Sequence, residues 1–269
     1  MRKNSPFNLR LGASIITLLA LAAIFGPFLL STDPQAIALE KSFAAPSRIN
    51  LFGCDNNGSD VLANIIYGAR LSLQVGLATT IFSLGIALVL GSLAGFFGGK
   101  VDLVLMRLLE IVFAFPGIIL AIAIASVMGP SKANIILALT ATGWAGYTRL
   151  VRGEVRALKE KEYIQSARAL GLSPARIIVF HIWPNLVSPL AVAATFGLAG
   201  AITAEASLSF LGVGVPPGTP SWGALLSAGK EFLFEAPHIS AFPGIAIMVT
   251  ILGFNFLGEG LRERLDPKG

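Results

Sequence analysis

Long apolar segments constrain this chain more than any other feature. A bilayer has a hydrocarbon core about 30 Å thick, which about 20 apolar residues can cross as a helix. Six segments approach or exceed this length, although the fifth contains Glu205. They are residues 11–30, 71–99, 111–131, 133–148, 186–211 and 236–258. We therefore expect an all-α integral membrane protein with six transmembrane helices.

The composition supports a membrane location. Charged residues make up 13% of the chain and hydrophobic residues 54%, whereas about a quarter of a soluble domain is charged. The first apolar segment follows Arg2, Lys3 and Arg10, as in a secretory signal peptide. It exceeds the usual apolar length of about 7–15 residues and lacks a small-residue cleavage pattern, so we expect a retained span.

The positions of the cations orient the spans. With the N-terminus in the cytoplasm, all but five of the 20 Lys and Arg residues fall on the cytoplasmic side. The five on the outer side are Lys41, Arg48, Arg70, Lys132 and Lys230. This asymmetry follows the positive-inside rule and places both termini in the cytoplasm. The basic residues are dispersed and have no aromatic stacking platform among them, which argues against a nucleic-acid partner.

The apolar segments also suggest how the chain is divided. The expected parts are an N-terminal tail with a peripheral first helix (1–31), an extracytoplasmic segment (32–70), a helical core (71–260) with a cytoplasmic loop (149–188), and a cytoplasmic tail (261–269). A second outer loop, residues 214–237, contains a cluster of Pro and Gly residues. We expect a short helix there that lies at the membrane interface, where Trp222 would be favourable.

The cytoplasmic loop is the most charged and punctuated stretch of the chain. From Val151 onward its residues are good helix formers, with acids and bases at helical spacing. Gly171 suits the left-handed conformation that ends a helix, and Ser173 and Pro174 suit the start of a second helix that Pro184 would stop. We expect a helix, a glycine corner and another helix. The alternative is a solvated loop that only connects two spans.

Several stretches resemble the permease subunits of ABC importers. The loop "QSARALGLSPARIIVFHIWPN" resembles the family pattern of Glu-Ala-Ala, three residues, Gly and a later Pro. Gln165 and Ser166 stand where the family usually has Glu and Ala, whereas Ala167, Gly171 and Pro184 match. The stretches "LFGCDNNGSDVLANIIYGARLSL", "GWAGYTRLVRGEV", "AEASLSFLGVGVPPGTPSWG" and "GLRERLDP" resemble the second permease of dipeptide, oligopeptide and nickel importers.

This resemblance implies a type I ABC-importer permease architecture in the inner or plasma membrane of a bacterium or archaeon. It implies as partners a homologous permease in a heterodimer, two cytosolic ABC ATPases, an extracytoplasmic substrate-binding protein and membrane lipid. The cytoplasmic loop would be a coupling helix that docks on an ATPase. The implied coupling residues are Gln165, Ser166, Ala167, Arg168, Ala169, Leu170, Gly171, Leu172 and Pro184. No cofactor is expected on this chain, because ATP and Mg²⁺ would bind to the partner ATPases.

The chain offers no catalytic or metal site of its own. Residues 94–101 lack the first Gly and the following Ser or Thr of a phosphate loop, so we expect a tight turn there. His181 and His238 fall on opposite sides of the membrane, and Cys54 is the sole cysteine. We therefore expect no shared metal, no internal disulfide and no enzyme activity in this chain.

Polar and aromatic side chains inside the spans are candidates for the translocation path. They are Thr142, Trp144, Thr195, Glu205, Ser207 and Asn255. Glu205 is the one acid within a span, where ionised groups usually face the bundle interior or a water-filled path. We favour a packing role, in which Glu205 pairs with a neighbouring backbone or a partner subunit and Ser207 and Ser209 hydrogen-bond between helices.

Cargo and energy source leave alternatives open. The resemblance favours short peptides as cargo, with nickel or another small solute next. An ion-driven secondary transporter is a hypothesis of a different class. It is supported by the repeat of "AFPGI" at residues 114–118 and 241–245, because paired Pro/Gly interruptions mark binding sites in such carriers. Little sequence around the two copies aligns.

Overall fold

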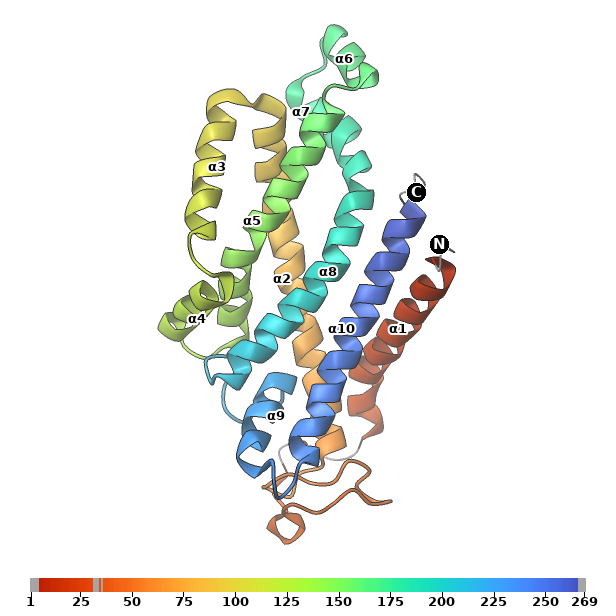
Figure 1. The fold of residues 1–269 in the computed structure, drawn as a ribbon, viewed down its shortest axis with the longest axis vertical. Coiled ribbons are helices and arrows are strands. Elements are labelled where there is room, and N and C mark those ends of the chain that lie inside the picture. Colours follow the sequence, from red (N-terminus) through yellow and green to blue (C-terminus); the bar gives the residue numbers. More distant parts are fainter. Residues whose placement is uncertain (1–4, 31–33, 35, 266–269) are drawn as a thin grey trace.

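The chain folds into an elongated bundle of helices (Figure 1). The structure is a computed structural model and describes residues 5–30, 34 and 36–265. The helices are α1 (Ser5–Leu29), α2 (Val61–Phe97), α3 (Gly99–Phe113), α4 (Gly117–Met128), α5 (Lys132–Leu158), α6 (Glu162–Ala169), α7 (Pro174–Ile177), α8 (Trp183–Phe210), α9 (Trp222–Gly229) and α10 (His238–Leu265). Within the described ranges no β-strand forms, which confirms the expected all-α class.

Among the described residues, four helical stretches are long and apolar enough to cross a membrane. They are residues 7–28 in α1, α2, residues 174–210 ending with α8, and α10. The bent pair of α3 and α4 makes five when it is counted as one span. α5 is also long, at 27 residues, but Arg149, Arg152 and Arg156 in its second half lower its apolar character. Length and composition therefore support four of the six predicted spans as single helices, and a fifth when the bent pair is counted as one.

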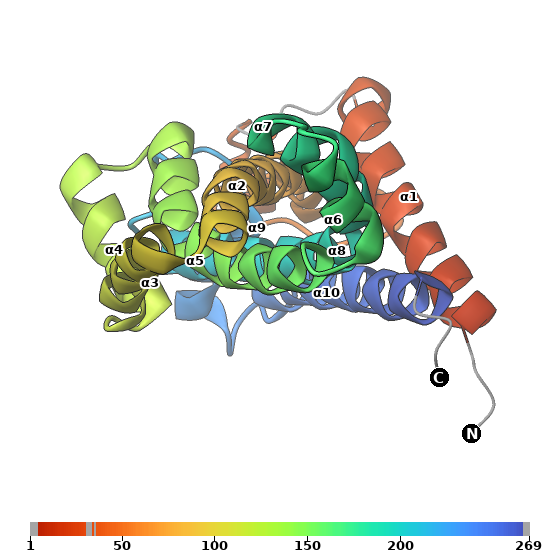
Figure 2. The ribbon, with the colours of Figure 1, turned by 90° about the horizontal axis from the view of Figure 1, so that it is seen from above.

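Helix α2 forms the centre of the bundle (Figure 2). α5 and α8 pack against it, and α1 and α10 lie side by side along the flank (Figure 1). The close approach of α1 and α10 depends on glycine: a Cβ atom at Gly12 would overlap the backbone of Leu257. Small residues of this kind let helices pack tightly in a membrane, where dispersion contacts replace the hydrophobic effect.

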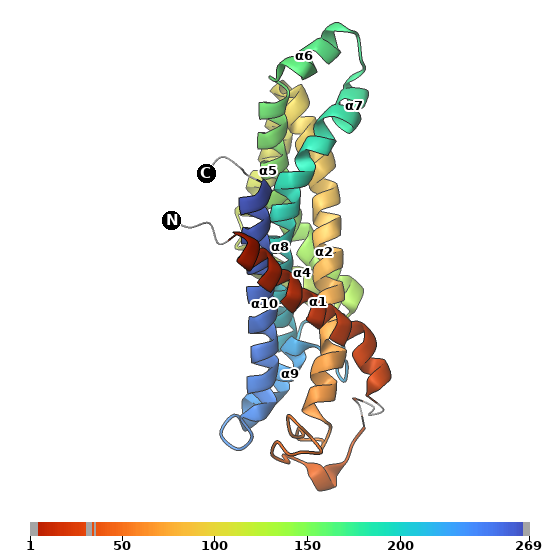
Figure 3. The same ribbon diagram turned by 90° about the vertical axis from the view of Figure 1, so that its right-hand side faces the viewer.

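The two ends of the bundle differ (Figure 3). α6 and α7 project at one end, and the described chain begins and finishes in the same half of the molecule. Residues 36–60 and α9 lie at the opposite end. This arrangement agrees with the predicted topology, although the orientation relative to a membrane stays a prediction.

The segment of residues 36–60 packs on the adjoining helix ends. Cys54 is free and fully buried, and burial together with nearby Asp60 raises the pKa of its thiol. The Cys54 carbonyl lies 3.1 Å from the Nε2 atom of His238, at the start of α10. Phe52 stacks on Phe242, with ring centres 4.1 Å apart. These contacts hold the outer segment against α10.

The predicted span at residues 111–131 is wrong as a single helix. The chain breaks between Phe113 and Gly117, and α3 and α4 meet at 81°. Pro116 lacks an amide hydrogen and disfavours helical geometry in the residue before it, so a helix ends there readily. α3 instead begins at Gly99, directly after the turn at Gly98. Both glycines have positive φ, which confirms the tight turn expected at residues 94–101.

Two other boundaries also differ from prediction. The segment at residues 133–148 continues as helix to Leu158, because good helix formers follow it. Pro184 does not stop a helix. It lies in the first turn of α8, directly after a π-helical turn at Ile178–Ile182 in which the Trp183 N–H bonds to the Ile178 carbonyl. The wider turn accommodates the proline.

The expected short helix in the second outer loop is α9, capped by the Ser221 side chain. The interfacial position expected for Trp222 is wrong. Trp222 is fully buried, and its indole N–H donates to the Ile65 carbonyl of α2 at 3.0 Å. The indole thus anchors α9 to the bundle through both its apolar body and its polar atom.

Candidate functional site

The corner between α6 and α7 lies at one end of the molecule (Figure 3). α6 ends in a Schellman motif: the Gly171 N–H donates to the Arg168 carbonyl at 2.9 Å, and the Leu172 N–H donates to the Ala167 carbonyl at 3.2 Å. Gly171 has a φ of +79°, a left-handed conformation that costs about 1–2 kcal/mol for other residues. The predicted glycine corner is confirmed, but the single helix expected from Val151 to the corner is interrupted at residues 159–161, between α5 and α6.

One face of α6 is fixed to the bundle. Ile164 is fully buried there. The Gln165 side-chain amide donates to the Lys159 carbonyl at the end of α5, at 3.0 Å. The Arg168 guanidinium lies 4.6 Å from the centre of the Phe96 ring near the end of α2, in a cation–π contact. α6 is therefore held against α5 and α2 rather than left as a loose loop.

The corner itself is open to solvent. Leu170 is 81% exposed, and the small residues Ser166, Ala169 and Gly171 are exposed beside it. Such a surface lets another protein approach the backbone closely. Residues 165–172 thus form one local structure, whereas Pro184 belongs to α8 and lies outside the corner.

An ion pair joins α3 to α5 near the same end of the bundle. Arg152 of α5 makes two hydrogen bonds to the Asp102 carboxylate in the first turn of α3, one of them 2.6 Å long between Nη2 and Oδ2. Both side chains are mostly shielded from solvent. Bidentate pairs of this kind fix the relative orientation of two planar groups. The pair therefore ties α3 to α5.

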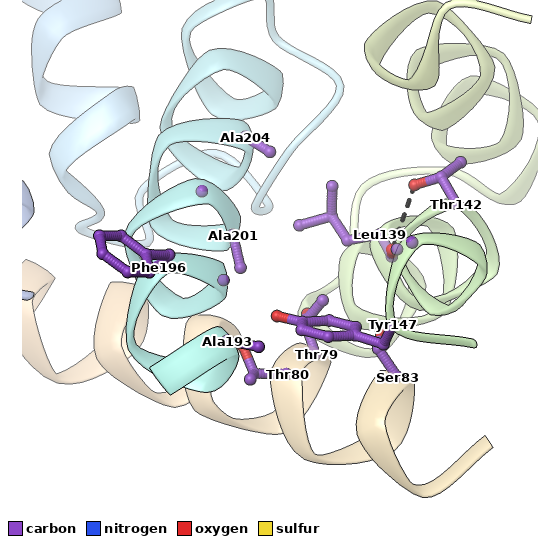
Figure 4. Close-up of a pocket in the computed structure, with 14 residues that line it drawn as sticks. Thr79, Thr80, Ser83, Leu139, Thr142, Tyr147, Ala193, Phe196, Ala201 and Ala204 are labelled. Atoms are coloured by element: carbon purple, nitrogen blue, oxygen red, sulfur yellow. Dashed lines mark hydrogen bonds between the residues drawn. The ribbon is translucent and has the colours of Figure 1, made fainter. Parts of the chain in front are cut away.

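A cavity of about 450 Å³ lies between α2, α5 and α8 (Figure 4). α2 contributes the hydroxyl side chains of Thr79, Thr80 and Ser83. α5 contributes Thr142 and Tyr147 among others. A volume of this size falls within the range of about 300–1,000 Å³ that is typical of small-ligand sites.

The α8 wall of the cavity is made almost entirely of small residues. They are Ala193, Gly197, Gly200, Ala201 and Ala204, with Phe196 as the one large side chain. Their spacing of three or four residues places them on one face of the helix. The cavity therefore has a hydroxyl-bearing wall on α2 and a smooth wall on α8.

Three buried hydroxyls lie close together on α2, whereas two other unpaired hydroxyls of the described helices, Thr140 of α5 and Ser240 of α10, lie outside the cavity lining. Thr79, Thr80 and Ser83 are at most 5% exposed. The Thr79 and Ser83 oxygens have no hydrogen-bond partner among the described residues, and Thr80 has only the Tyr147 hydroxyl beside it. Six other helical hydroxyls instead donate to carbonyls three or four residues earlier. These are Thr142, Thr148, Thr195, Thr203, Ser207 and Thr250. An unpaired buried polar group costs about 1–3 kcal/mol, so a hydrogen-bond partner for the Thr79 and Ser83 hydroxyls would be stabilising.

Tyr147 extends from α5 across the cavity toward α8 (Figure 4). Its hydroxyl lies close to Thr80 and directly against Gly197. A Cβ atom at Gly197 would overlap the hydroxyl oxygen and lie 2.8 Å from the ring carbon Cζ. Tyr147 therefore narrows the space between α5 and α8, and glycine at position 197 makes room for it.

Of the six predicted path residues, Thr142 alone lines this cavity. The Trp144 indole N–H bonds to the Ala141 carbonyl of its own helix. Thr195 faces Gly258 of α10. Ser207 and Asn255 are half-buried outside the cavity lining. Apart from Thr142, the cavity is lined by residues that were not predicted from the sequence.

Glu205 is fully buried in a separate polar cluster. Its carboxylate accepts hydrogen bonds from Ser72 of α2 at 2.7 Å and from Ser209 of α8 at 2.8 Å. The Ser72 bond links two helices, as a packing role requires, but the partners are serine side chains of this chain rather than the predicted backbone or partner subunit. Ser209 and Ser207 bond within α8, so the expectation that these two serines bridge helices is wrong.

The sequence does carry a signal for the cavity. Thr79, Thr80 and Ser83 interrupt an apolar segment at positions that share one helical face. The small residues of α8 recur at the matching spacing. In the part of the chain that the structure describes, no group of three or more His, Cys, Asp or Glu side chains is placed to hold a metal ion.

Comparison with known proteins identifies consistent similarities. Residues 87–268 match the family described as binding-protein-dependent transport system inner membrane component. The chain is 42% identical over 257 residues to the dipeptide transport system permease protein of Alkalihalophilus pseudofirmus, covering 96% of this chain and 84% of that protein.

Two further relatives extend the similarity. A putative peptide transport system permease of Brucella suis is 39% identical over all of this chain and 89% of its own length. The glutathione transport system permease of Pectobacterium atrosepticum is 38% identical over 97% of this chain and 87% of its own length.

The fold is also found in a solved structure. An inward-facing form of the MetNI methionine ABC transporter contains a chain that superposes with a TM-score of 0.61 at 19% identity. The superposition covers 75% of this chain and 96% of the other. At this identity the match shows a shared fold.

Proposed function

The chain belongs to the family of inner membrane components of binding-protein-dependent transport systems, and we propose that it conducts short peptides across the membrane. It is a permease subunit of an ABC importer. The relatives named above are permeases for dipeptides, peptides and glutathione, and each is at least 38% identical over nearly the whole chain. Glutathione is itself a short peptide, so all three relatives are named for the same class of cargo.

The exposed corner at Leu170 and Gly171 is the observation that carries the coupling role. In the proposed mechanism the corner enters a groove on a cytosolic ATPase, with small neighbouring residues that allow close approach. The bonds from Gln165 to Lys159 and from Arg168 to the Phe96 ring transmit movement of the corner to α5 and α2. ATP hydrolysis on the ATPases would then shift the membrane helices.

Members of this family work with further permease, ATPase and substrate-binding subunits. For this chain we infer a heterodimer with one homologous permease, two ATPases that bind ATP and Mg²⁺, and one binding protein outside the cell. This chain then needs no cofactor and hydrolyses no ATP itself.

The multi-pass chain lies in a membrane, and we infer its orientation from the cations. Both termini and the α6–α7 corner face the cytoplasm of a bacterium or archaeon, because most Lys and Arg residues fall on that side. Residues 36–60 and α9 then face outward, where a binding protein delivers the cargo.

Reconstituted vesicles test this function. We expect uptake of a labelled dipeptide only when this chain, its partner permease, the ATPases, the binding protein and ATP are all present. Uptake of labelled Ni²⁺ in place of dipeptide would overturn the cargo assignment. Uptake by the purified chain alone, driven by an ion gradient, would overturn the ABC mechanism. The "AFPGI" copies do not favour that outcome, because residues 114–118 break a helix whereas residues 241–245 lie inside α10.

A further inference from the structure

We propose that the cavity between α2, α5 and α8 binds the main chain of the cargo through its amide groups, an inference that rests on the proposed peptide transport. The occupant is inferred from three properties of the cavity. These are its buried unpaired hydroxyls, its uncharged lining and its smooth wall of small residues.

The hydroxyls call for a hydrogen-bonding occupant. Thr79 and Ser83 are buried without hydrogen-bond partners in the described part of the chain, and the Thr80 hydroxyl has only the Tyr147 hydroxyl beside it. A lipid acyl chain would add no partner to any of the three. A hydroxyl group both donates and accepts hydrogen bonds. A peptide amide has one N–H and one C=O, so it can donate a hydrogen bond to one hydroxyl and accept a hydrogen bond from another.

The lining favours an uncharged group. Every side chain that lines the cavity is a hydroxyl-bearing, aromatic or aliphatic residue, or glycine. An ionised ammonium or carboxylate placed there would lose water without gaining a counter-charge, which is strongly unfavourable. The lining also lacks the imidazole and thiolate ligands that transition metals prefer. The peptide main chain between its charged ends fits these conditions.

The opposite wall explains how one cavity can serve many peptide sequences. Gly200, Ala201 and Ala204 present little beyond backbone, whereas Gly197 is covered by Tyr147. A peptide held by its main chain on α2 can direct different side chains toward this surface without a specific pocket. The cavity therefore recognises what all peptides share.

Removal of the hydroxyls tests the proposal. In the complete reconstituted importer, the triple variant Thr79→Val, Thr80→Val and Ser83→Ala keeps similar volumes and removes three hydroxyls. We expect the KM for dipeptide uptake to rise about tenfold, the factor for losing one or two neutral hydrogen bonds. Thr203→Val is the matched control, because the Thr203 hydroxyl bonds to its own helix at the Ala199 carbonyl and lies outside the cavity lining.

Filling the cavity is the second test. A side chain at Gly200 meets no atom within 4 Å at its Cβ position, so Gly200→Leu should fold and occupy the cavity. We expect at least a tenfold loss of dipeptide uptake while the complex still assembles. Gly85→Leu is the control, because Gly85 is equally unobstructed at Cβ and lies on α2 outside the cavity lining.

The outcomes separate the two proposals. Absence of dipeptide uptake by the wild-type importer would contradict the proposed function. Normal wild-type uptake with unchanged KM and maximal rate in the triple variant would overturn the main-chain site and leave a water-filled cavity. Loss of uptake in Gly200→Leu together with an unchanged triple variant would also overturn amide recognition. It would show that the cargo passes through the cavity without hydrogen-bonding to the hydroxyls.

Discussion

The contact between Tyr147 and Gly197 sets, at the scale of single residues, how closely α5 and α8 approach. The tyrosine hydroxyl occupies the space where any other residue at position 197 would have its Cβ atom. Gly200, three residues later on the same helix, has open space around the equivalent position. Gly197 therefore makes room for Tyr147, whereas Gly200 leaves the cavity open. Substitutions at the two positions should have different effects.

We expect Gly197→Ala to lower the free energy of unfolding by about 1–3 kcal/mol, the usual cost of overpacking. Adding Tyr147→Phe should restore part of the loss, because the nearest remaining ring atom would lie 2.8 Å from the new methyl group. Thermal unfolding of the purified chain in detergent measures both effects. Gly200→Ala is the control and should be at least as stable as wild type. Equal melting temperatures for Gly197→Ala and Gly200→Ala would contradict the assigned contact.

At the scale of elements, two prolines show what the sequence could and could not predict. Pro116 ends α3 whereas Pro184 lies inside a continuing helix. The residue type is the same; the difference is the π-helical turn before Pro184, whose residues Ile178 and Ile182 pack in the core. Apolar length predicted most spans, because a helix in the membrane forms its backbone hydrogen bonds within its own segment. The cavity depends on how three helices face one another, which no single segment encodes.

The α6–α7 corner gives an element-scale prediction. Gly171→Val should reduce cargo-stimulated ATP hydrolysis of the reconstituted importer at least fivefold without unfolding the bundle. A β-branched residue at a φ of +79° shifts the corner backbone, at a cost of about 1–2 kcal/mol. Gly153→Val is a matched control, because both glycines have open space at Cβ but Gly153 is helical. Equal stimulation in the two variants would mean that the corner is only a connector.

At the scale of the whole molecule, the cation asymmetry predicts which end faces the cytoplasm. Glu160 near the corner and Glu235 at the opposite end are both exposed. In a Cys54→Ser background, we expect Glu160→Cys to react with an impermeant thiol reagent only from the cytoplasmic side. Glu235→Cys should react only from outside. Labelling intact cells and inverted vesicles measures both, and reaction of the two positions from one side would refute the topology.

The unbroken helical run of residues 174–210 joins the two functional regions in one piece. Its 37 residues amount to about 55 Å at 1.5 Å per residue. The corner lies at one end, and the smooth cavity wall begins about 20 residues along it. If this rod tilts about a point between its ends, the corner and the cavity wall on α8 move in opposite directions. Bending at the π-helical turn or at Pro189 would reduce the movement that is transmitted from the corner to the cavity wall. The position of the pivot therefore sets how far the cavity widens for each displacement of the corner.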